Sequence, residues 1–212
     1  MYFNWVKTNK WIKTFFNNLV WVIPNSDKKI YLTFDDGPIP EVTEWVLDIL
    51  KLEGIKATFF CIGDNIKKHP EIYKRILSED HQIGNHTFNH LNGWKIKKDI
   101  YIENFKMCEN EHSKIETQNS KLFRPPYGKI LPRQANAIRN LGYKIIMWDV
   151  LSFDFNSSTT PEKCLENVIS NTEQGSIIVF HDSKKAEKNL KFALQKSIQI
   201  LKNNGFVFDV IK

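Results

Sequence analysis

Two adjacent carboxylates, Asp35 and Asp36, follow a short apolar and β-branched run and precede Gly37-Pro38, so they lie where a strand gives way to a turn. Successive side chains of an extended backbone point in opposite directions. The two carboxylates therefore cannot simply chelate one ion together, and they have different roles if both take part in chemistry. An ordinary turn with two solvated carboxylates is the structural alternative.

His86 and His90 are four residues apart, a spacing that places two imidazoles on one face of a helical turn. With Asp36 they would offer two nitrogens and one oxygen, a set that suits one zinc ion, with cobalt or nickel as alternatives. Three protein ligands leave room for water and substrate, which is typical of catalytic metal sites. A cation there would acidify a water molecule and polarise a carbonyl oxygen, and Asp35 would accept the proton.

These side chains need a scaffold that brings them together, and the chain alternates strand-like and helix-like segments from Lys28 onward. Several helix-like segments end in a glycine that directly precedes a β-rich run, as at Gly54 and Gly175. We expect strands near 29–34, 57–61, 82–85, 121–124, 144–150, 176–181 and 206–211. We expect helices near 41–53, 70–79, 95–113, 132–141, 161–173 and 188–204.

This alternation predicts an α/β fold with a parallel sheet, and seven strands in one domain favour a distorted (β/α) barrel over a doubly wound open sheet. Polar residues follow five of the strands, and the carboxyl ends of barrel strands form one face. We expect these residues to converge there: Asp35, Asp36, His86, His90, Arg124, Tyr127, Asp149, Asp154, His181 and Asp182. The chain has no GxGxxG or GxxxxGK[ST] motif, so no nucleotide or nucleic-acid partner is expected.

Composition limits the possibilities further. A length of 212 residues fits a single α/β barrel, and 42% apolar residues can supply its core. The formal charge of +6 comes from lysines scattered along the chain, which indicates a solvated exterior. Cys61, Cys108 and Cys164 are odd in number and form no CxxC pair, so we expect buried thiols and neither a disulfide framework nor a zinc site.

Residues 1–24 predict an amphipathic helix, with residues 1–27 as a lead-in to a catalytic domain over 28–212. We expect its apolar face to pack against the barrel, and contact with an anionic membrane surface is the alternative. The segment lacks a small-residue cleavage site and the chain lacks an 18-residue apolar run, so we expect neither a signal peptide nor a transmembrane helix, and a cytoplasmic or membrane-surface location. The apolar face comprises Trp5, Ile12, Phe15, Phe16, Leu19 and Ile23.

Five ordered motifs resemble those of polysaccharide deacetylases with a NodB-homology domain, which are metal-dependent carbohydrate esterases. The resemblance runs from about residue 28 to the C-terminus. It implies a distorted barrel of seven (β/α) units and removal of acetyl groups from N-acetylated sugars with a divalent metal. The motifs are Thr33-Phe34-Asp35-Asp36-Gly37-Pro38, His86-Thr87-Phe88-Asn89-His90, Arg124-Pro125-Pro126-Tyr127-Gly128, Trp148-Asp149 through Asp154-Phe155, and Ile178-Val179-Phe180-His181-Asp182.

The resemblance also implies a role for each residue. Asp35 would be the general base, paired with Arg124, and His181 the general acid that protonates the leaving amine. Asp154 would align His181, although Asp149 competes for that role. The backbone N–H of Tyr127 would help to stabilise the oxyanion. The metal ligands would be Asp36, His86 and His90.

Some residues depart from the family pattern. Phe155 replaces the usual tryptophan and Val179 the usual leucine, which changes the expected pocket for the acetyl methyl group. Trp94 is either a stacking surface for a pyranose ring or a buried core aromatic. We therefore expect an N-deacetylase of GlcNAc-type sugars, such as chitooligosaccharides, or of peptidoglycan. The alternatives are an amidohydrolase of a small non-sugar amide and an inactive carbohydrate-binding protein.

Overall fold

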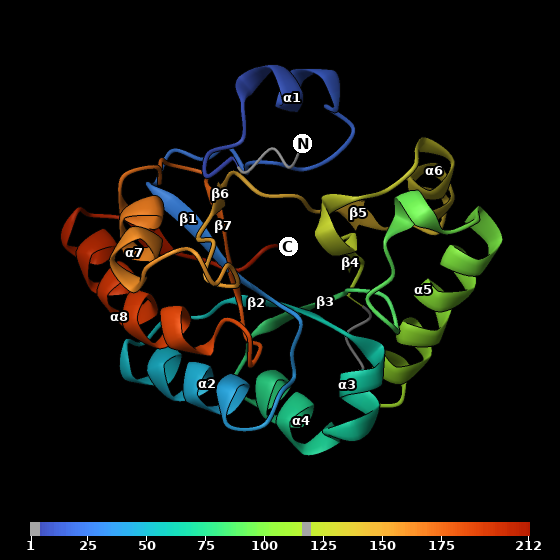
Figure 1. The fold of residues 1–212 in the computed structure, drawn as a ribbon, viewed down its shortest axis with the longest axis horizontal. Helices are drawn as coiled ribbons and strands as arrows, with labels where there is room; N and C mark the ends of the chain where they lie inside the picture. Colours follow the sequence, from blue (N-terminus) through green and yellow to red (C-terminus); the bar gives the residue numbers. More distant parts are fainter. Residues whose placement is uncertain (1–4, 116–119) are drawn as a thin grey trace.

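The computed structural model describes residues 5–115 and 120–212, and its centre is a parallel sheet curled into a distorted barrel (Figure 1). The strand order is β5-β4-β3-β2-β1-β7-β6, and β8 pairs with β1. All of these pairings are parallel, as the alternation of strands and helices predicts. The strands are β1 (Lys29–Asp35), β2 (Thr58–Cys61), β3 (Gln82–Asn85), β4 (Leu122–Phe123), β5 (Lys144–Ile145), β6 (Val150–Leu151), β7 (Ile177–His181) and β8 (Val207–Phe208).

Strand β1 shows why this sequence builds a sheet that is covered on both faces. Ile30, Leu32 and Phe34 belong to the large cluster packed under the outer helices. Tyr31 belongs to a second cluster inside the barrel. Because side chains alternate along a strand, Asp35 lies on the same side of β1 as Tyr31 and therefore faces the barrel interior.

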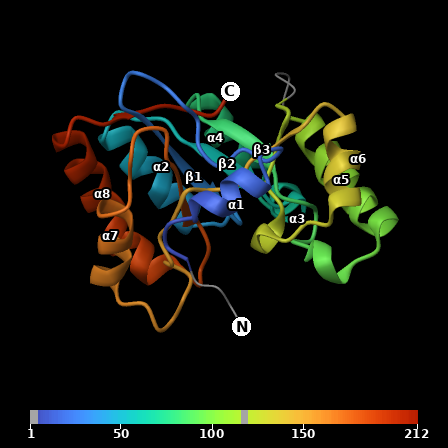
Figure 2. The same ribbon diagram turned by 90° about the horizontal axis from the view of Figure 1, so that it is seen from above.

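The helices form the outer layer, and they follow one another around the sheet (Figures 1 and 2). Cys61, Cys108 and Cys164 are buried thiols, as their spacing predicts. The helix over 63–68 was not among the expected elements. The helices of this layer are α2 (Val42–Leu52), α3 (Gly63–Lys68), α4 (Pro70–Ser78), α5 (Lys98–Ser113), α6 (Pro132–Asn140), α7 (Pro161–Ile169) and α8 (Glu187–Asn203), with short 3₁₀ turns at Gly93–Lys95 and Pro126–Gly128.

The expected strand over 144–150 is wrong, because the chain leaves the sheet after β5 and returns at β6. The two strands are opposite edges of the sheet and do not pair with each other. The N-terminal segment spans this gap: Val20 bridges to Ile146 next to β5, and Lys7 bridges to Val150 in β6. These bridges satisfy backbone groups that the edges would otherwise leave open.

The amphipathic helix expected over residues 1–24 is also wrong in extent, since helix α1 covers only Lys10–Phe15 and residues 1–4 lie outside the described part of the chain. The flanking residues are extended because their backbone pairs with the sheet edges. Ile12 and Leu19 pack against the barrel as expected. Phe15 and Phe16 do not, because both are exposed. No described helix has the length and apolar character needed to cross a bilayer.

Candidate active site

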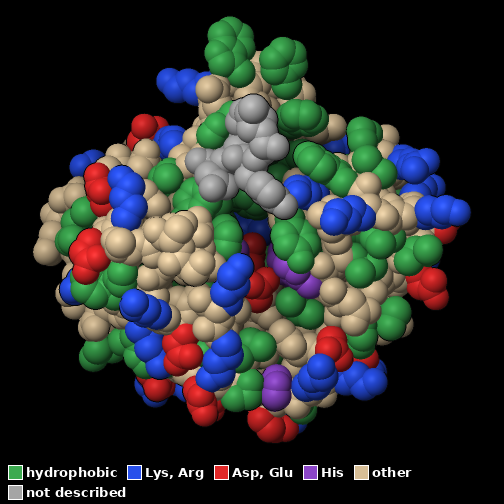
Figure 3. Space-filling view, in the orientation of Figure 1, with side chains coloured by type: hydrophobic (Ala, Val, Ile, Leu, Met, Phe, Trp, Pro, Cys, Tyr) green, Lys and Arg blue, Asp and Glu red, His purple; other side chains and the backbone are tan. Residues whose placement is uncertain are grey.

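The carboxyl ends of β1 and β7 bring two titratable side chains together. Asp35 is the last residue of β1 and His181 the last residue of β7, and they are register partners in the parallel pair. Partner residues on neighbouring strands are about 4.8 Å apart. In the space-filling view, acidic and histidine side chains lie in a recess near the middle of the face shown (Figure 3).

Asp35 is buried against Arg124, which follows β4. The Arg124 Nη1 atom donates hydrogen bonds to Asp35 Oδ1 at 2.6 Å and to Thr33 Oγ1 at 2.8 Å. Burial by itself would raise the pKa of the Asp35 carboxyl, but the charges of Arg124 and His181 and the hydrogen bond from Arg124 hold that pKa below its usual value. Asp35 is therefore ionised at neutral pH and can accept a proton.

The Arg124 side chain has no exposed surface and is held on every side. Its Nε and Nη2 atoms donate to the carbonyl oxygens of Ile146 and Met147, and its guanidinium stacks 4.0 Å from the Phe60 ring centroid. Four of its five N–H donors are used, which fixes the orientation of the guanidinium toward Asp35. The expected pairing of Arg124 with Asp35 is what the structure has.

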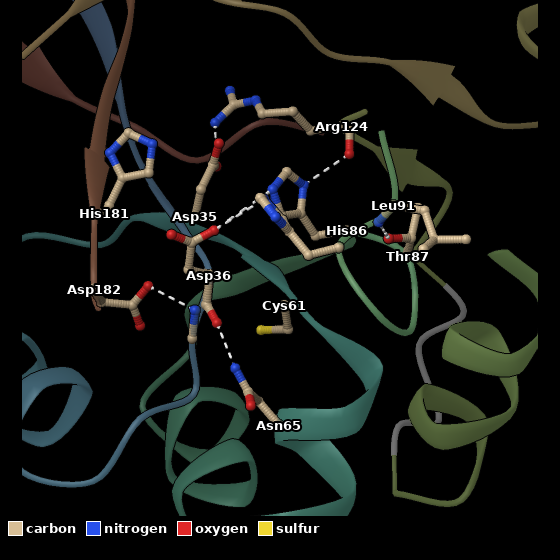
Figure 4. A network of polar contacts seen from close by, with 12 residues as sticks. Asp35, Asp36, Cys61, Asn65, His86, Thr87, Leu91, Arg124, His181 and Asp182 are labelled. Atoms are coloured by element: carbon tan, nitrogen blue, oxygen red, sulfur yellow. Dashed lines mark hydrogen bonds and ion pairs between the residues drawn. The ribbon is translucent and has the colours of Figure 1, made fainter. Parts of the chain in front are cut away.

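Asp36 turns away from the direction that a continuing strand would give it. Its φ is 87°, and Asn65 Nδ2 donates to its carbonyl oxygen at 2.7 Å. This turn directs the Asp36 carboxylate toward the imidazole of His86, while Asp35 points to Arg124 (Figure 4). The two carboxylates thus have different partners, as their adjacency in sequence predicted.

His86 and His90 meet Asp36 across a loop and not on a helical turn, so that expectation is wrong. Thr87 and His90 have φ values of 64° and 55°, which a right-handed helix excludes. His90 Nε2 lies 3.3 Å and His86 Nε2 3.9 Å from Asp36 Oδ1. Both imidazoles lie near Asp36 as expected, but a loop and not a helix sets their orientation.

The loop is held by two asparagines that the sequence analysis did not single out. Asn104 Oδ1, from α5, accepts hydrogen bonds from Phe88 N and Asn89 N. Asn85 Oδ1 accepts from Thr87 N at 2.8 Å. Both asparagines are buried, and a buried amide within a strand or an amphipathic helix is the sequence signal that could have indicated them.

Three ligand atoms are suitably placed for a metal ion. One atom each from Asp36, His86 and His90 lies within 4.8 Å of the other two. Among the described residues, Asp36 Oδ1 is buried without a hydrogen-bond partner, and such an oxygen is costly unless a cation or water meets it.

The protonation of the two histidines suits the same role. His86 Nδ1 lies 2.7 Å from Arg124 O, an acceptor, so Nδ1 carries the proton and the Nε2 lone pair faces Asp36. Burial lowers the pKa of His86, and it lowers the pKa of His90 to about 4. Two neutral imidazoles and one carboxylate fit a divalent cation.

Of the two aspartates considered as partners of His181, Asp154 is the one that contacts it. Asp154 Oδ1 lies 2.8 Å from His181 Nδ1, and Asp154 Oδ2 accepts from His181 N at 2.6 Å. Burial opposes the charge, but Asp154 outweighs it and the pKa of His181 rises to about 9. Asp149 has another function: its carboxylate accepts from Lys7, Lys13 and Ser176.

Asp182 lies directly beneath the turn that follows the two carboxylates. Its Oδ1 accepts from Gly37 N at 3.0 Å and its Oδ2 from Thr43 Oγ1 at 2.6 Å. A Cβ at residue 37 would lie 1.9 Å from Asp182 Oδ2, so only glycine permits this approach. Asp182 thus positions the turn and does not cap a helix.

Aromatic side chains border the site. The exposed Tyr127 ring lies 4.5 Å from the His90 ring, and Tyr127 has a φ of 60°. Phe155 is half-buried, 4.7 Å from the His181 ring, and Val179 is buried in the cluster against which Phe155 packs. Trp94 is exposed, so its alternative as a core aromatic is wrong.

Comparison with known proteins points to one family. A sequence model described as polysaccharide deacetylase matches residues 23–146. A Bacillus cereus peptidoglycan-N-acetylglucosamine deacetylase is 37% identical over 186 residues, covering 87% of this chain and 67% of that protein. A second such B. cereus enzyme is 34% identical over 192 residues, covering 90% of this chain and 89% of its own length.

The fold gives the same result. A crystal structure of a peptidoglycan N-acetylglucosamine deacetylase, in complex with 4-naphthalen-1-yl-N-oxidanyl-benzamide, has a TM-score of 0.88 and 33% identity with this chain. The match covers 96% of this chain and 94% of that one. The similarity therefore includes most of the N-terminal segment as well as the barrel.

Proposed function

This chain belongs to the polysaccharide deacetylase family, a family of hydrolases, and we propose that it removes acetyl groups from N-acetylglucosamine residues of peptidoglycan. The observation that carries this proposal is the meeting of three metal-ligand atoms with a base and an acid on neighbouring strands. The peptidoglycan substrate is supported by the names of the similar enzymes.

The metal site is assigned to Asp36, His86 and His90, and we propose zinc as the ion. A divalent cation there would polarise the acetyl carbonyl and lower the pKa of the attacking water. The preference for zinc follows from the donor set of two imidazoles and one carboxylate. Cobalt and nickel accept the same donors.

The chain's own residues then handle the protons. Asp35 takes one proton from the attacking water, and Arg124 holds the carboxylate in place for that transfer. As the bond from the water oxygen to the carbonyl carbon forms, the backbone N–H of Tyr127 donates to the developing oxyanion.

His181 completes the reaction. Its charged imidazole gives a proton to the sugar nitrogen as the C–N bond breaks, so the products are acetate and a free amine. Asp154 keeps that imidazole charged and oriented until the transfer. Phe155 and Val179 would form the apolar side of the acetyl pocket, and Trp94 would stack on a neighbouring pyranose ring.

Acetate release is the direct test, measured with peptidoglycan fragments, chitooligosaccharides and a small N-acetyl amide. We expect release from the saccharides, loss of activity after chelation, and recovery with zinc. Asp35→Asn should reduce kcat by about a hundredfold or more. Asp48→Asn is the matched control, because Asp48 is an exposed carboxylate on α2. Full turnover by Asp35→Asn would overturn the mechanism, and turnover of the small amide alone would overturn the substrate class.

A further inference from the structure

Helix α1 presents large apolar side chains to solvent. Trp11, Phe15 and Phe16 are 73%, 80% and 53% exposed, and none of the residues of α1 is buried. Trp11 and Phe15 are four residues apart and so lie on one face of the helix. Apolar side chains project outward over α1 at the top of the molecule (Figures 1 and 3). Adjoining exposed rings of this size mark an interaction surface.

Several contacts hold helix α1, which carries these rings, against the barrel. Lys13 from α1 and Lys7 before it both donate to the buried Asp149 carboxylate. At the C-terminal end of the helix, Trp21 Nε1 donates to Phe16 O at 3.0 Å. Ile12 packs on the barrel from the helix itself. The surface is therefore presented in one orientation, and little conformational entropy is lost when it binds.

The charge of this surface is positive. Residues 1–26 contain Lys7, Lys10 and Lys13 and no aspartate or glutamate. Arg139 is held against the same segment, since its Nη1 atom donates to Asn18 O at 3.3 Å. Among the described residues, the carboxylates that form ion pairs with the segment are the buried Asp149 and Glu173. Four cations thus meet two carboxylates.

A groove of about 520 Å³ lies next to the exposed rings. Its walls combine indole rings with ammonium groups, which suits an anionic headgroup beside an apolar phase. Phenylalanine rings that project outward would enter the apolar region, where they need no hydrogen-bond partner. The groove is lined by Trp5, Lys7, Lys10, Trp11, Lys13 and Glu173, among others.

We infer that this surface, formed by Trp5, Lys10, Trp11, Phe15 and Phe16, docks the protein on an anionic phospholipid membrane. The indole rings lie at the headgroup level, the phenylalanine rings enter the apolar region, and Lys10 faces the lipid phosphates. The recessed acidic and histidine side chains lie on a different part of the surface from α1 (Figure 3). Docking through α1 therefore leaves the active site open to a polymer next to the membrane.

Sedimentation with vesicles tests the inference on the full chain. We expect binding to vesicles of equal parts phosphatidylcholine and phosphatidylglycerol, with weaker binding to phosphatidylcholine alone. The double variant Trp11→Ser/Phe15→Ser should lower the partition coefficient by about tenfold or more. Lys10→Gln should lower it by about fivefold, and only for the anionic vesicles.

Matched controls come from the opposite end of the molecule. Leu52→Ser replaces a similarly exposed apolar residue of α2, and Lys51→Gln replaces an exposed lysine of the same helix. Neither should change vesicle binding. All variants should keep the melting temperature and acetate release of the parent protein, because none of these residues is part of the active site.

Each alternative partner for this surface gives a different experimental result. If the double variant binds vesicles as well as the parent, the membrane inference is overturned while the deacetylase proposal is untouched. If the parent does not bind vesicles but binds purified peptidoglycan through Trp11 and Phe15, the surface binds a glycan instead. If the double variant turns a dimer into a monomer in light scattering, the partner is a second copy of the chain.

Discussion

His181 Nδ1 lies 2.8 Å from Asp154 Oδ1, and this pairing holds the pKa of the imidazole at about 9 against the opposing effect of burial. Replacement of Asp154 by asparagine removes the charge but keeps the size. The pKa of His181 should fall, because only the smaller effects of the Asp36 and Asp35 charges then oppose burial.

The consequence is a change in the pH profile of the enzyme. In the proposed mechanism His181 is the acid, so activity requires its protonated form and should decline as pH rises through its pKa. In Asp154→Asn the alkaline limb of kcat should move to lower pH, and kcat at pH 8 should fall by about tenfold or more. The matched control is Asp149→Asn, which leaves the limb in place. An unmoved limb in Asp154→Asn would contradict the role of this pair.

Asp149 carries a different prediction, one of stability. It is 2% exposed and joins Lys7 and Lys13 to the sheet. Asp149→Ala removes the buried carboxylate that Lys7 and Lys13 share, and Lys7 keeps only Glu173 and the Asn171 carbonyl oxygen, so the free energy of unfolding should drop by about 3 kcal/mol. Urea denaturation measures this drop. Asp64→Ala, which breaks an exposed pair with Lys68, should cost less than about 1 kcal/mol.

The side chains that meet at the strand ends show where sequence reasoning succeeds. The alternation of β1 predicts that Asp35 follows a buried strand, and the polar residues at strand ends predict the meeting of Asp35, Asp36, His86 and His181. These predictions need only local periodicity and the rule that parallel strands end on one face. The structure confirms the barrel and brings those side chains together.

Sequence reasoning fails where a contact is made by residues far apart in the chain. Lys7 and Asp149 are separated by 142 residues, and their pairing explains why residues 5–24 cross the sheet gap and do not form one long helix. The turn at Thr87 and His90 has positive φ values that no local signal indicates, because Asn104 on another element stabilises it. Tertiary contacts overrode local preference in both places.

Two buried histidines outside the active site predict how stability depends on pH. Burial lowers the pKa of His81 to about 4 and that of His112 to about 3, against an ordinary value of 6.5. The folded protein keeps both rings neutral, whereas the unfolded chain binds a proton at each below pH 6.5. Above pH 6.5 both rings are neutral in the folded and in the unfolded state, so they do not affect stability. Below pH 6.5 only the unfolded chain binds these protons, and the free energy of unfolding falls as pH falls from 6.5 toward 4.

The expected loss is about 1.4 kcal/mol per pH unit for each histidine. His81→Gln isolates one of them, because Ala57 N donates to His81 Nδ1 at 3.2 Å and a glutamine oxygen can accept the same bond. The free energy of unfolding, measured in urea between pH 7 and pH 5, should depend less steeply on pH in this variant, because unfolding then takes up one proton fewer. An equal slope would mean that His81 is already protonated in the folded protein.

Asn104 offers a test of how the His86–His90 loop is held. Its Oδ1 accepts from Phe88 N and Asn89 N, and its Nδ2 donates to Asn89 Oδ1 at 2.9 Å. Asn104→Ala leaves Asn89 N without its acceptor and leaves Phe88 N with only the main-chain carbonyl of residue 104, at 3.2 Å, so the loop should relax and His90 should move relative to Asp36. Metal affinity, measured by titration of the chelator-treated protein with zinc, should fall by about tenfold or more.

The control separates this effect from a general loss of fold. Asn136→Ala removes an exposed amide from α6 and should leave zinc affinity unchanged. Because Asn104 contacts the loop and not the ligands themselves, excess zinc should restore much of the kcat of Asn104→Ala, whereas it should not rescue His90→Ala. If Asn104→Ala binds zinc as tightly as the parent, the orientation of the loop does not depend on α5, and the ligands themselves position it.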